Sequence, residues 1–300
     1  GVRHAAVAAT RLGLIGNPPD AVEPTLDKRV LRARLRACGR RQPAVDVGIA
    51  GPWVVKPVDR SAGEGVVLAA TTAERDRWST LVRARYGCEP LVEEFIAGPE
   101  VIVEGFLDGG DLQVLASFDK PGDRRGPTFP ETILVSPSAY EPEAVAEAAA
   151  ACRALGLRAG PVHVEVVIAD SGPVVIEVHA RSIGGLCSNV VRCDPPLEQV
   201  LVLAALGRPP TVRRDPRPAG VLMLPVPRPG VLVAVDGVDS ARLVDGVTGV
   251  DITALGRRVT PLPDRGEYLG FVYAEGPTAM AVEAALLAAE GCLGYRFDGA

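Results

Sequence analysis

The sequence predicts a mixed α/β fold, and three observations carry that prediction. Stretches with apolar residues at helical spacing alternate along the chain with short apolar or alternating runs that are typical of strands. Clusters of Gly and Pro separate these stretches, as turns and loops require. The 300 residues are 47% hydrophobic and 23% charged, which is enough apolar material for a sizeable core and too much for a disordered chain.

The first part of the chain predicts two helices. We interpret residues 1–26, with one helix over 5–15 that Gly and Pro end, as the remnant of an N-terminal domain. Asp27 precedes a helix over 28–38, and Gly39 ends it in a conformation that only glycine adopts cheaply. The apolar side of this helix is expected to comprise Val30, Leu31, Leu35 and Cys38.

Residues 27–96 would form a small subdomain, in which little chain separates Pro43 from Trp53. Its strands are runs of apolar and β-branched residues, and Thr72 is a suitable helix cap. In order, we expect a strand over 53–55, a small-residue loop over 61–65, a strand over 66–69, a helix over 72–86 and a strand over 91–96.

Residues 97–210 would form a larger subdomain and residues 211–300 a C-terminal α/β lobe, because four prolines between 207 and 218 mark a boundary. In the larger part we expect strands over 101–106 and 112–118, a mobile loop over 121–130, a helix over 142–155, a hairpin of strands over 162–169 and 174–178, and a helix over 197–206. The lobe would hold several strands and a last helix near 278–289.

Charge and cysteine content exclude several classes of function. Lys and Arg total 32 against 37 Asp and Glu, so a net charge of −5 provides no drive toward nucleic acid or anionic lipid. No apolar run is long enough to span a bilayer. The six cysteines form no Cys-x-x-Cys pair, which favours reduced thiols in a cytoplasmic protein over a disulfide scaffold or a zinc knuckle.

The predicted hairpin over 162–178 carries the most informative pattern. If its turn centres on Ser171, Glu165 lies opposite Glu177 and His163 opposite His179, with Val174, Ile176 and Val178 toward the core. Opposed carboxylates about 4 Å apart repel by about 4 kcal/mol at an effective dielectric near 20. A hard divalent cation between them would relieve that repulsion, whereas an exposed strand face with chance acids remains an alternative.

Residues after the hairpin favour the cation. Arg181 followed by Gly184-Gly185 would place a guanidinium and a flexible turn beside the acids, as a polyphosphate needs. A zinc or manganese site made by both histidines and both glutamates, without nucleotide, stays open.

The first half of the chain offers weaker candidates. Lys56 ends an apolar strand and would point over a loop that contains Gly63 and Gly65, although an ordinary hairpin turn explains the glycines equally well. Glu93 and Glu94 at a strand end are also compatible with a solvated edge.

Several motifs follow one another along the chain. They are Asp27-Lys28, Val55-Lys56-Pro57 with its small-residue loop, residues 93–100, Asp119-Lys120, residues 126–132, the Glu165/Glu177/Arg181 hairpin, residues 180–187, Pro261-Leu262-Pro263 and residues 268–271. This ordered set resembles the ATP-grasp superfamily, most closely its carboxylate–amine ligase branch of L-amino-acid-ligase-like proteins. The resemblance implies two α+β subdomains that sandwich ATP, followed by the C-terminal lobe.

The resemblance also implies a role for each candidate residue. Lys28 and Lys56 would hold the α- and β-phosphates of ATP under a mobile loop with Ser61, Gly63 and Gly65. Glu93, Glu94 and Ile96 would line the adenine slot, Glu100 would bind the ribose, and Lys120 would approach the γ-phosphate. Glu165, Glu177 and His179 would hold Mg²⁺, with Mn²⁺ as an alternative, and Arg181 would neutralise charge on the transferred phosphoryl group. Family members usually have asparagine where this chain has His179.

The implied activity is an ATP-dependent ligase that joins an amino acid or another carboxylate to an amine through an acyl phosphate, releasing ADP and phosphate. Another ATP-grasp ligase, of the glycinamide-ribonucleotide-synthetase-like or carboxylase type, and a nucleotide-binding remnant without catalysis are the alternatives. The partners would be small molecules, with no nucleic acid and no membrane, and the last lobe could serve as a homodimer surface.

Overall fold

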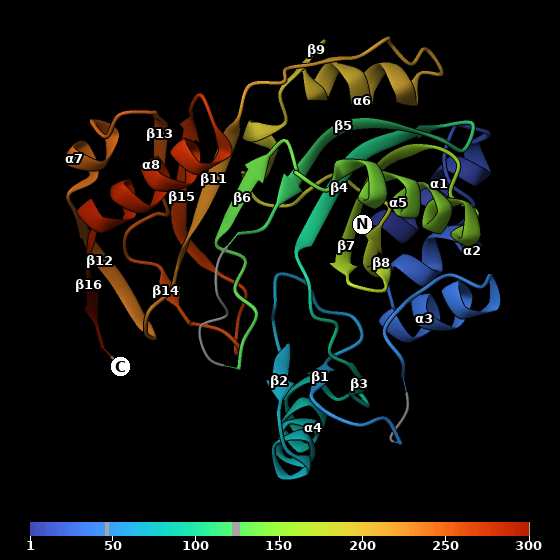
Figure 1. Cartoon of the computed structure of the whole chain (residues 1–300), viewed down its shortest axis with the longest axis horizontal. Coiled ribbons are helices and arrows are strands. Elements are labelled where there is room, and N and C mark those ends of the chain that lie inside the picture. The colour runs from blue at the N-terminus through green and yellow to red at the C-terminus, as the bar shows by residue number, and fades with distance from the viewer. Residues whose placement is uncertain (46–47, 122–126, 300) are drawn as a thin grey trace. The chain divides into compact units, whose positions relative to one another are not determined.

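The computed structural model describes residues 1–45, 48–121 and 127–299 (Figure 1). The chain divides into two compact units. Unit 1 comprises Gly1–Ala50, Glu93–Asp119 and Ser138–Pro216, and unit 2 comprises Gly51–Val92, Lys120–Pro137 and Arg217–Ala300. Helices and antiparallel sheets in both units confirm the mixed α/β prediction. The subdomain boundaries proposed from the sequence stay a prediction.

Unit 1 combines four antiparallel strands in the order β5-β4-β7-β8 with several helices. The strands are β4 (Glu100–Asp108), β5 (Asp111–Asp119), β7 (Gly160–Ala169), β8 (Gly172–His179) and the short pair β9 (Cys193–Asp194) and β10 (Arg213–Arg214). The helices are α1 (Val2–Leu12), α2 (Pro19–Val22), α3 (Lys28–Ala37), α5 (Glu141–Leu155), α6 (Leu197–Ala205) and the 3₁₀ turns Glu23–Thr25 and Cys187–Val190.

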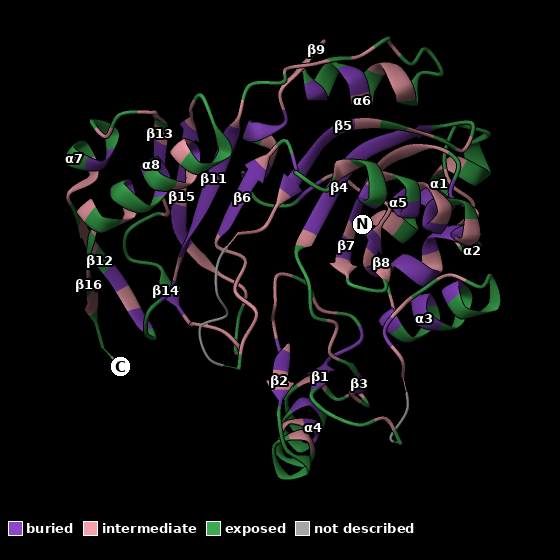
Figure 2. Ribbon diagram, in the orientation of Figure 1, coloured by how far each residue is buried: buried purple, intermediate pink, exposed green. Residues whose placement is uncertain are grey.

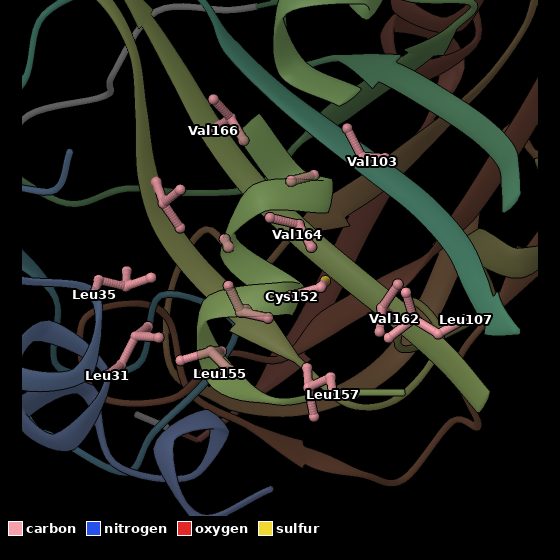
Figure 3. Close-up of a cluster of buried hydrophobic side chains, with 14 of the residues drawn as sticks. Leu31, Leu35, Val103, Leu107, Cys152, Leu155, Leu157, Val162, Val164 and Val166 are labelled. Atoms are coloured by element: carbon pink, nitrogen blue, oxygen red, sulfur yellow. The ribbon is translucent and has the colours of Figure 1, made fainter. Parts of the chain in front are cut away.

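Helix α5 covers one face of this sheet (Figure 1). Its buried residues recur every three or four positions, and half of them are alanine, so the helix axis approaches the strands closely. Figure 3 shows Cys152 and Leu155 of α5 beside Val162 and Val164 of β7, all four fully buried. This core holds β7 and β8 rigidly and leaves the other face of the hairpin for polar side chains.

Helix α3 packs on the same core with a different face than the sequence predicted. Leu31 and Leu35 are buried as expected, but Val30 and Cys38 are exposed. Lys28 and Arg32 are buried in their place, at the i, i+4 spacing of one helix face. Asp27 caps the helix by accepting a 2.8 Å hydrogen bond from the backbone N–H of Arg29.

Unit 2 holds a small α/β element and a larger sheet. The small element is the hairpin of β1 (Trp53–Lys56) and β2 (Val67–Ala69) with α4 (Thr72–Tyr86), while β3 (Leu91–Glu94) runs on into unit 1. The cap of α4 is Thr71, not Thr72, because the Thr71 hydroxyl accepts from the N–H of Glu74 and the Glu74 carboxylate accepts from the N–H of Thr71. Figure 2 shows that α4 is largely exposed.

The larger sheet of unit 2 runs in the order β13-β15-β11-β6, all antiparallel, with α8 packed on it. Its strands are β6 (Ile133–Ser136), β11 (Ala219–Pro225), β13 (Val247–Ile252) and β15 (Tyr268–Glu275), and the helices of this part are α7 (Val238–Arg242) and α8 (Ala279–Cys292). A separate antiparallel sheet in the order β14-β12-β16 comprises β12 (Gly230–Asp236), β14 (Arg258–Val259) and β16 (Gly294–Asp298). Strand β6 was not predicted, since its partner β11 lies more than eighty residues away and local pattern carries no sign of it.

Several element bounds differ from the predictions. The strand expected over 91–96 ends at Glu94, and the predicted loop over 121–130 lies partly outside the described residues. None of the helices within the described ranges has the length and apolarity that crossing a bilayer demands.

Candidate functional site

The hairpin of β7 and β8 brings two carboxylates and two imidazoles together in unit 1. Glu165 pairs with Glu177 and His163 with His179, as the sequence predicted. Residues directly opposite each other in an antiparallel pair share one face of the sheet, so all four side chains lie on the face away from the apolar core. Donor atoms of Glu165, Glu177 and His179 all lie within 4.8 Å of one another.

A β-bulge makes this register possible. Near the turn, Ala169 pairs with Gly172 and Val166 with Val175. This pairing is shifted by one residue from the pairing that a turn centred on Ser171 would give. The extra residue, Ile176, restores the predicted pairing beyond it. Ile176 was predicted to face the core, but the bulge places Val175 there instead.

Helix α3 supplies a buried cation to the same cluster. Lys28 Nζ lies 3.1 Å from Glu177 Oε1, and the two side chains are 8% and 15% exposed. Glu177 Oε2 lies 3.0 Å from Nε2 of His179. Lys28, which was expected to bind phosphate, therefore stands within reach of the acid pair, and the structure brings four predicted site residues together.

Sequence reasoning missed Glu104, which completes the cluster, and used His163 only in the alternative zinc or manganese site. Glu104 of β4 contacts Nδ1 of His163, whose Nε2 lies 3.2 Å from Glu165 Oε1. Burial lowers the pKa of His163, but the Glu104 and Glu165 carboxylates outweigh burial and raise it to about 10. The two carboxylates thus favour the protonated imidazole of His163, which can donate to both acids. A lone acid inside the apolar run 101–107 was the available signal.

Arg181 begins the turn that follows β8. Its Nη1 donates a 2.8 Å hydrogen bond to the carbonyl of Ser182, so the guanidinium lies against its own turn. The backbone N–H of Ile183 donates to Glu104 Oε2 at 3.0 Å. Gly185 adopts a φ of 61°, a conformation that favours glycine.

The predicted adenine-slot residues lie at the end of β3. Glu93 is buried and accepts two hydrogen bonds from Arg32, from Nε at 2.9 Å and from Nη2 at 3.2 Å. Glu94 is exposed, and its backbone N–H donates to the carbonyl of Ala44 at 2.9 Å. The Glu93 carboxylate is thus held by an ion pair, which leaves backbone groups as the base-reading part of the prediction. Ile96 follows β3, and Glu100 begins β4, both half-buried.

Unit 2 contains the remaining predicted residues. Lys56 is buried at the end of β1. In the loop from Ser61, Gly63 and Gly65 have φ of 71° and 72°. A Cβ at Gly63 would lie 2.7 Å from the carbonyl oxygen of Phe129, so both space and conformation require glycine there.

Lys120 lies in unit 2, where it forms an ion pair with Glu131. Its Nζ is 3.7 Å from Glu131 Oε1, and both side chains are at most about a quarter exposed. Glu131 belongs to the 126–132 motif of the sequence, so these two motifs meet within the unit.

The unit 1 cluster fits a hard divalent cation. The carboxylates of Glu104, Glu165 and Glu177 lie beside two groups that can carry positive charge, Lys28 and His163. Carboxylate oxygens are the ligands that Mg²⁺ prefers, and Mn²⁺ accepts an imidazole beside them. Glu165, Glu177 and His179 are the residues that could hold such an ion.

Two domain families match the sequence. Residues 49–190 match the ATP-grasp domain, and residues 222–297 match the L-amino acid ligase C-terminal domain 2. The first match contains the acid hairpin and the glycine loop, and the second contains most of the larger sheet of unit 2.

Curated relatives are longer than this chain. Carnosine synthase 1 of Gallus gallus is 30% identical over 80% of this chain and 31% of its own length. Dapdiamide A synthase of Enterobacter agglomerans is 30% identical over 45% and 34%. An uncharacterized protein of Sinorhizobium fredii, y4rH, is 28% identical over 90% and 61%. The chain therefore spans less than two thirds of each of these relatives.

Solved structures agree with the family matches. The L-amino acid ligase from Bacillus licheniformis has a TM-score of 0.82 at 26% identity, covering 99% of this chain and 78% of that one. Phosphoribosylglycinamide synthetase from Anaerococcus prevotii has a TM-score of 0.70 at 15% identity, covering 99% and 80%, and shows the shared fold alone. Together, the domain matches show that residues 49–190 carry an ATP-grasp domain and residues 222–297 the L-amino acid ligase C-terminal domain 2.

Proposed function

We propose that this chain carries the catalytic apparatus of an ATP-dependent carboxylate–amine ligase. The observation that carries the proposal is the cluster of Glu165, Glu177 and His179, whose donor atoms lie within 4.8 Å of one another beside the buried Lys28. A half-buried acid pair next to a buried lysine suits a metal-bound polyphosphate, and the ATP-grasp family match supports ATP as that polyphosphate.

The reaction would proceed in two displacements. A carboxylate oxygen of the first substrate attacks the γ-phosphorus of ATP, the bond from that phosphorus to the bridging oxygen breaks, and ADP leaves. The amine nitrogen of the second substrate then attacks the acyl carbon, phosphate leaves, and the nitrogen loses a proton as the amide forms. The chain's part is to hold the reactants in line and keep water from the acyl phosphate.

Unit 1 residues have distinct parts in this proposal. Lys28 binds phosphate oxygens, and Arg181 neutralises charge that develops on the transferred phosphoryl group. Glu165, Glu177 and His179 would hold Mg²⁺ or Mn²⁺, which supplies positive charge next to the phosphates. Because Lys28 Nζ already lies 3.1 Å from Glu177 Oε1, it also holds that carboxylate in place until nucleotide arrives.

The roles of unit 2 residues stay predictions from the family resemblance. Lys56 and Lys120 would contact phosphates, and the loop with Ser61, Gly63 and Gly65 would cover them. The backbone N–H of Gly65 donates to the carbonyl of Pro263 at 2.8 Å and that of Glu64 to the carbonyl of Ser61 at 3.2 Å, so contact of these N–H groups with phosphate would require the loop to rearrange. A homodimer, the cytoplasmic location and the identity of both substrates likewise stay predictions.

Phosphate release tests the proposal. The chain is supplied with ATP, Mg²⁺ and pools of amino acids, taken singly and in pairs. We expect release that requires two amino acids, and its loss in Lys120→Ala. Arg83→Ala is the matched control, because it also removes a long cationic side chain of unit 2. Arg83 is exposed and forms an ion pair with the exposed Glu89.

Other outcomes would redirect the proposal. ATP binding without phosphate release would indicate a nucleotide-binding remnant. Zinc binding without ATP binding would indicate a metal module, and release that depends on bicarbonate and an amine would indicate a carboxylase-type enzyme.

A further inference from the structure

Glu104 lies at the centre of the unit 1 cluster, although no step of the proposed reaction uses it. Its side chain is 3% exposed, and its two oxygens have different partners. One oxygen contacts Nδ1 of His163, and the other accepts a 3.0 Å hydrogen bond from the backbone N–H of Ile183. A buried carboxylate is stable only with such partners, so Glu104 fixes the position of both.

His163 extends this connection to the metal-binding face. Glu104 and His163 are paired across β4 and β7, and Ile102 and Glu165 form the adjacent pair, so the three polar side chains lie on one face. Because Glu104 holds Nδ1, the imidazole cannot flip without losing that contact. Its Nε2 is thereby aimed at Glu165 Oε1, 3.2 Å away.

Ile183 extends the connection in the other direction. It lies two residues after Arg181, and its own side chain is buried. With the amide held by Glu104 and the side chain in the core, the first half of the turn has little freedom. The start of the turn that carries Arg181 is therefore set by the same carboxylate that sets His163.

We infer that Glu104 and His163 are positioning residues, which orient the Glu165 carboxylate for the cation and the Arg181 turn for the phosphoryl group. The inference rests on the proposed function, since Glu165 and Arg181 have these tasks only there. Partners behind a metal ligand typically change metal affinity by about 10- to 100-fold when they are lost.

Two substitutions separate the links of this chain. His163→Asn keeps a donor near the Nδ1 position and so retains Glu104, but it cannot reach Glu165. Glu104→Asp keeps the charge but is one methylene too short to bridge His163 and Ile183. We expect each to weaken binding of Mn²⁺ in the presence of ADP by about tenfold or more.

Binding of Mn²⁺ is measured from the free-ion electron paramagnetic resonance signal during titration with ADP present. Glu141→Gln is the matched control: Glu141 is also a hydrogen-bonded acid of unit 1, held by Arg214 at 2.7 and 2.6 Å outside the cluster. Hydrogen exchange of the Ile183 amide is followed in parallel and should accelerate in Glu104→Asp alone. If the shorter side chain prevents folding, Glu104→Gln, which has the same size, replaces it.

The outcomes are distinct. Weakened Mn²⁺ binding in both variants, with wild-type binding in Glu141→Gln, supports the inference. Wild-type binding in both variants, while Glu165→Gln loses it, overturns the inference and leaves the proposed function standing. Absence of Mn²⁺ binding by the unsubstituted chain overturns the metal site and the inference together.

Discussion

The ion pair of Arg32 and Glu93 offers a sharp test of how unit 1 is held together. Both side chains are 2% exposed, and the guanidinium donates to both carboxylate oxygens at 2.9 and 3.2 Å. Arg32 Nη2 also donates to the carbonyl of Ile176, the bulge residue of β8, at 2.9 Å. The pair therefore connects α3, β3 and the acid hairpin.

Arg32→Met leaves the Glu93 carboxylate buried without its cation. Breaking a buried pair by removing one partner costs about 3–5 kcal/mol, which is a large part of a typical stability of about 5–15 kcal/mol. The double variant Arg32→Met/Glu93→Met removes both charges and replaces them with apolar side chains. The free energy of unfolding of this double variant should fall by only about 1 kcal/mol, mainly because the carbonyl of Ile176 loses its hydrogen-bond donor.

Urea unfolding followed by far-UV circular dichroism measures these differences. We expect the double variant to be more stable than Arg32→Met, a strongly non-additive result. The reasoning would be refuted if the double variant lost as much unfolding free energy as Arg32→Met and Glu93→Met lose in sum. ATP affinity of the double variant then decides the adenine role: if stability returns and ATP affinity does not, the Glu93 carboxylate takes part in nucleotide binding.

Three further predictions test other parts of the structure. Glu177→Gln should abolish Mg²⁺-dependent ATP binding, measured by isothermal titration calorimetry, and unchanged binding would remove Glu177 from the site. Thr71→Ala should lower the free energy of unfolding by about 1 kcal/mol through loss of the α4 cap, and unchanged amide exchange in the first turn would contradict that role. Burial raises the pKa of the Cys152 thiol to about 12, so Cys152 should stay protonated at pH 9 to 10 and resist iodoacetamide while the exposed Cys38 reacts; labelling of both at equal rates, read by mass spectrometry, would contradict the burial.

The sequence predicted those features of the site that depend on short-range periodicity. The alternation of apolar and polar residues in 162–178 predicted that Glu165 and Glu177 share a face, although their direct pairing depends on the bulge at Ile176. The order of the motifs was sufficient to indicate the ATP-grasp superfamily. The bulge at Ile176 escaped prediction, since an inserted residue leaves the composition of the strand unchanged.

Which charges are buried was decided by contacts between residues far apart in the chain. Arg32 and Glu93 are 61 residues apart in the sequence, and Glu104 and His163 are 59 apart. The local sequence pattern around each residue therefore does not predict its partner. Periodicity predicted that Val30 lies on the inner face of α3, but Lys28 and Arg32 occupy that face. They are buried there because each forms an ion pair, Lys28 with Glu177 and Arg32 with Glu93. A charge enters a protein interior only when a partner compensates its lost hydration, and only the folded chain supplies that partner.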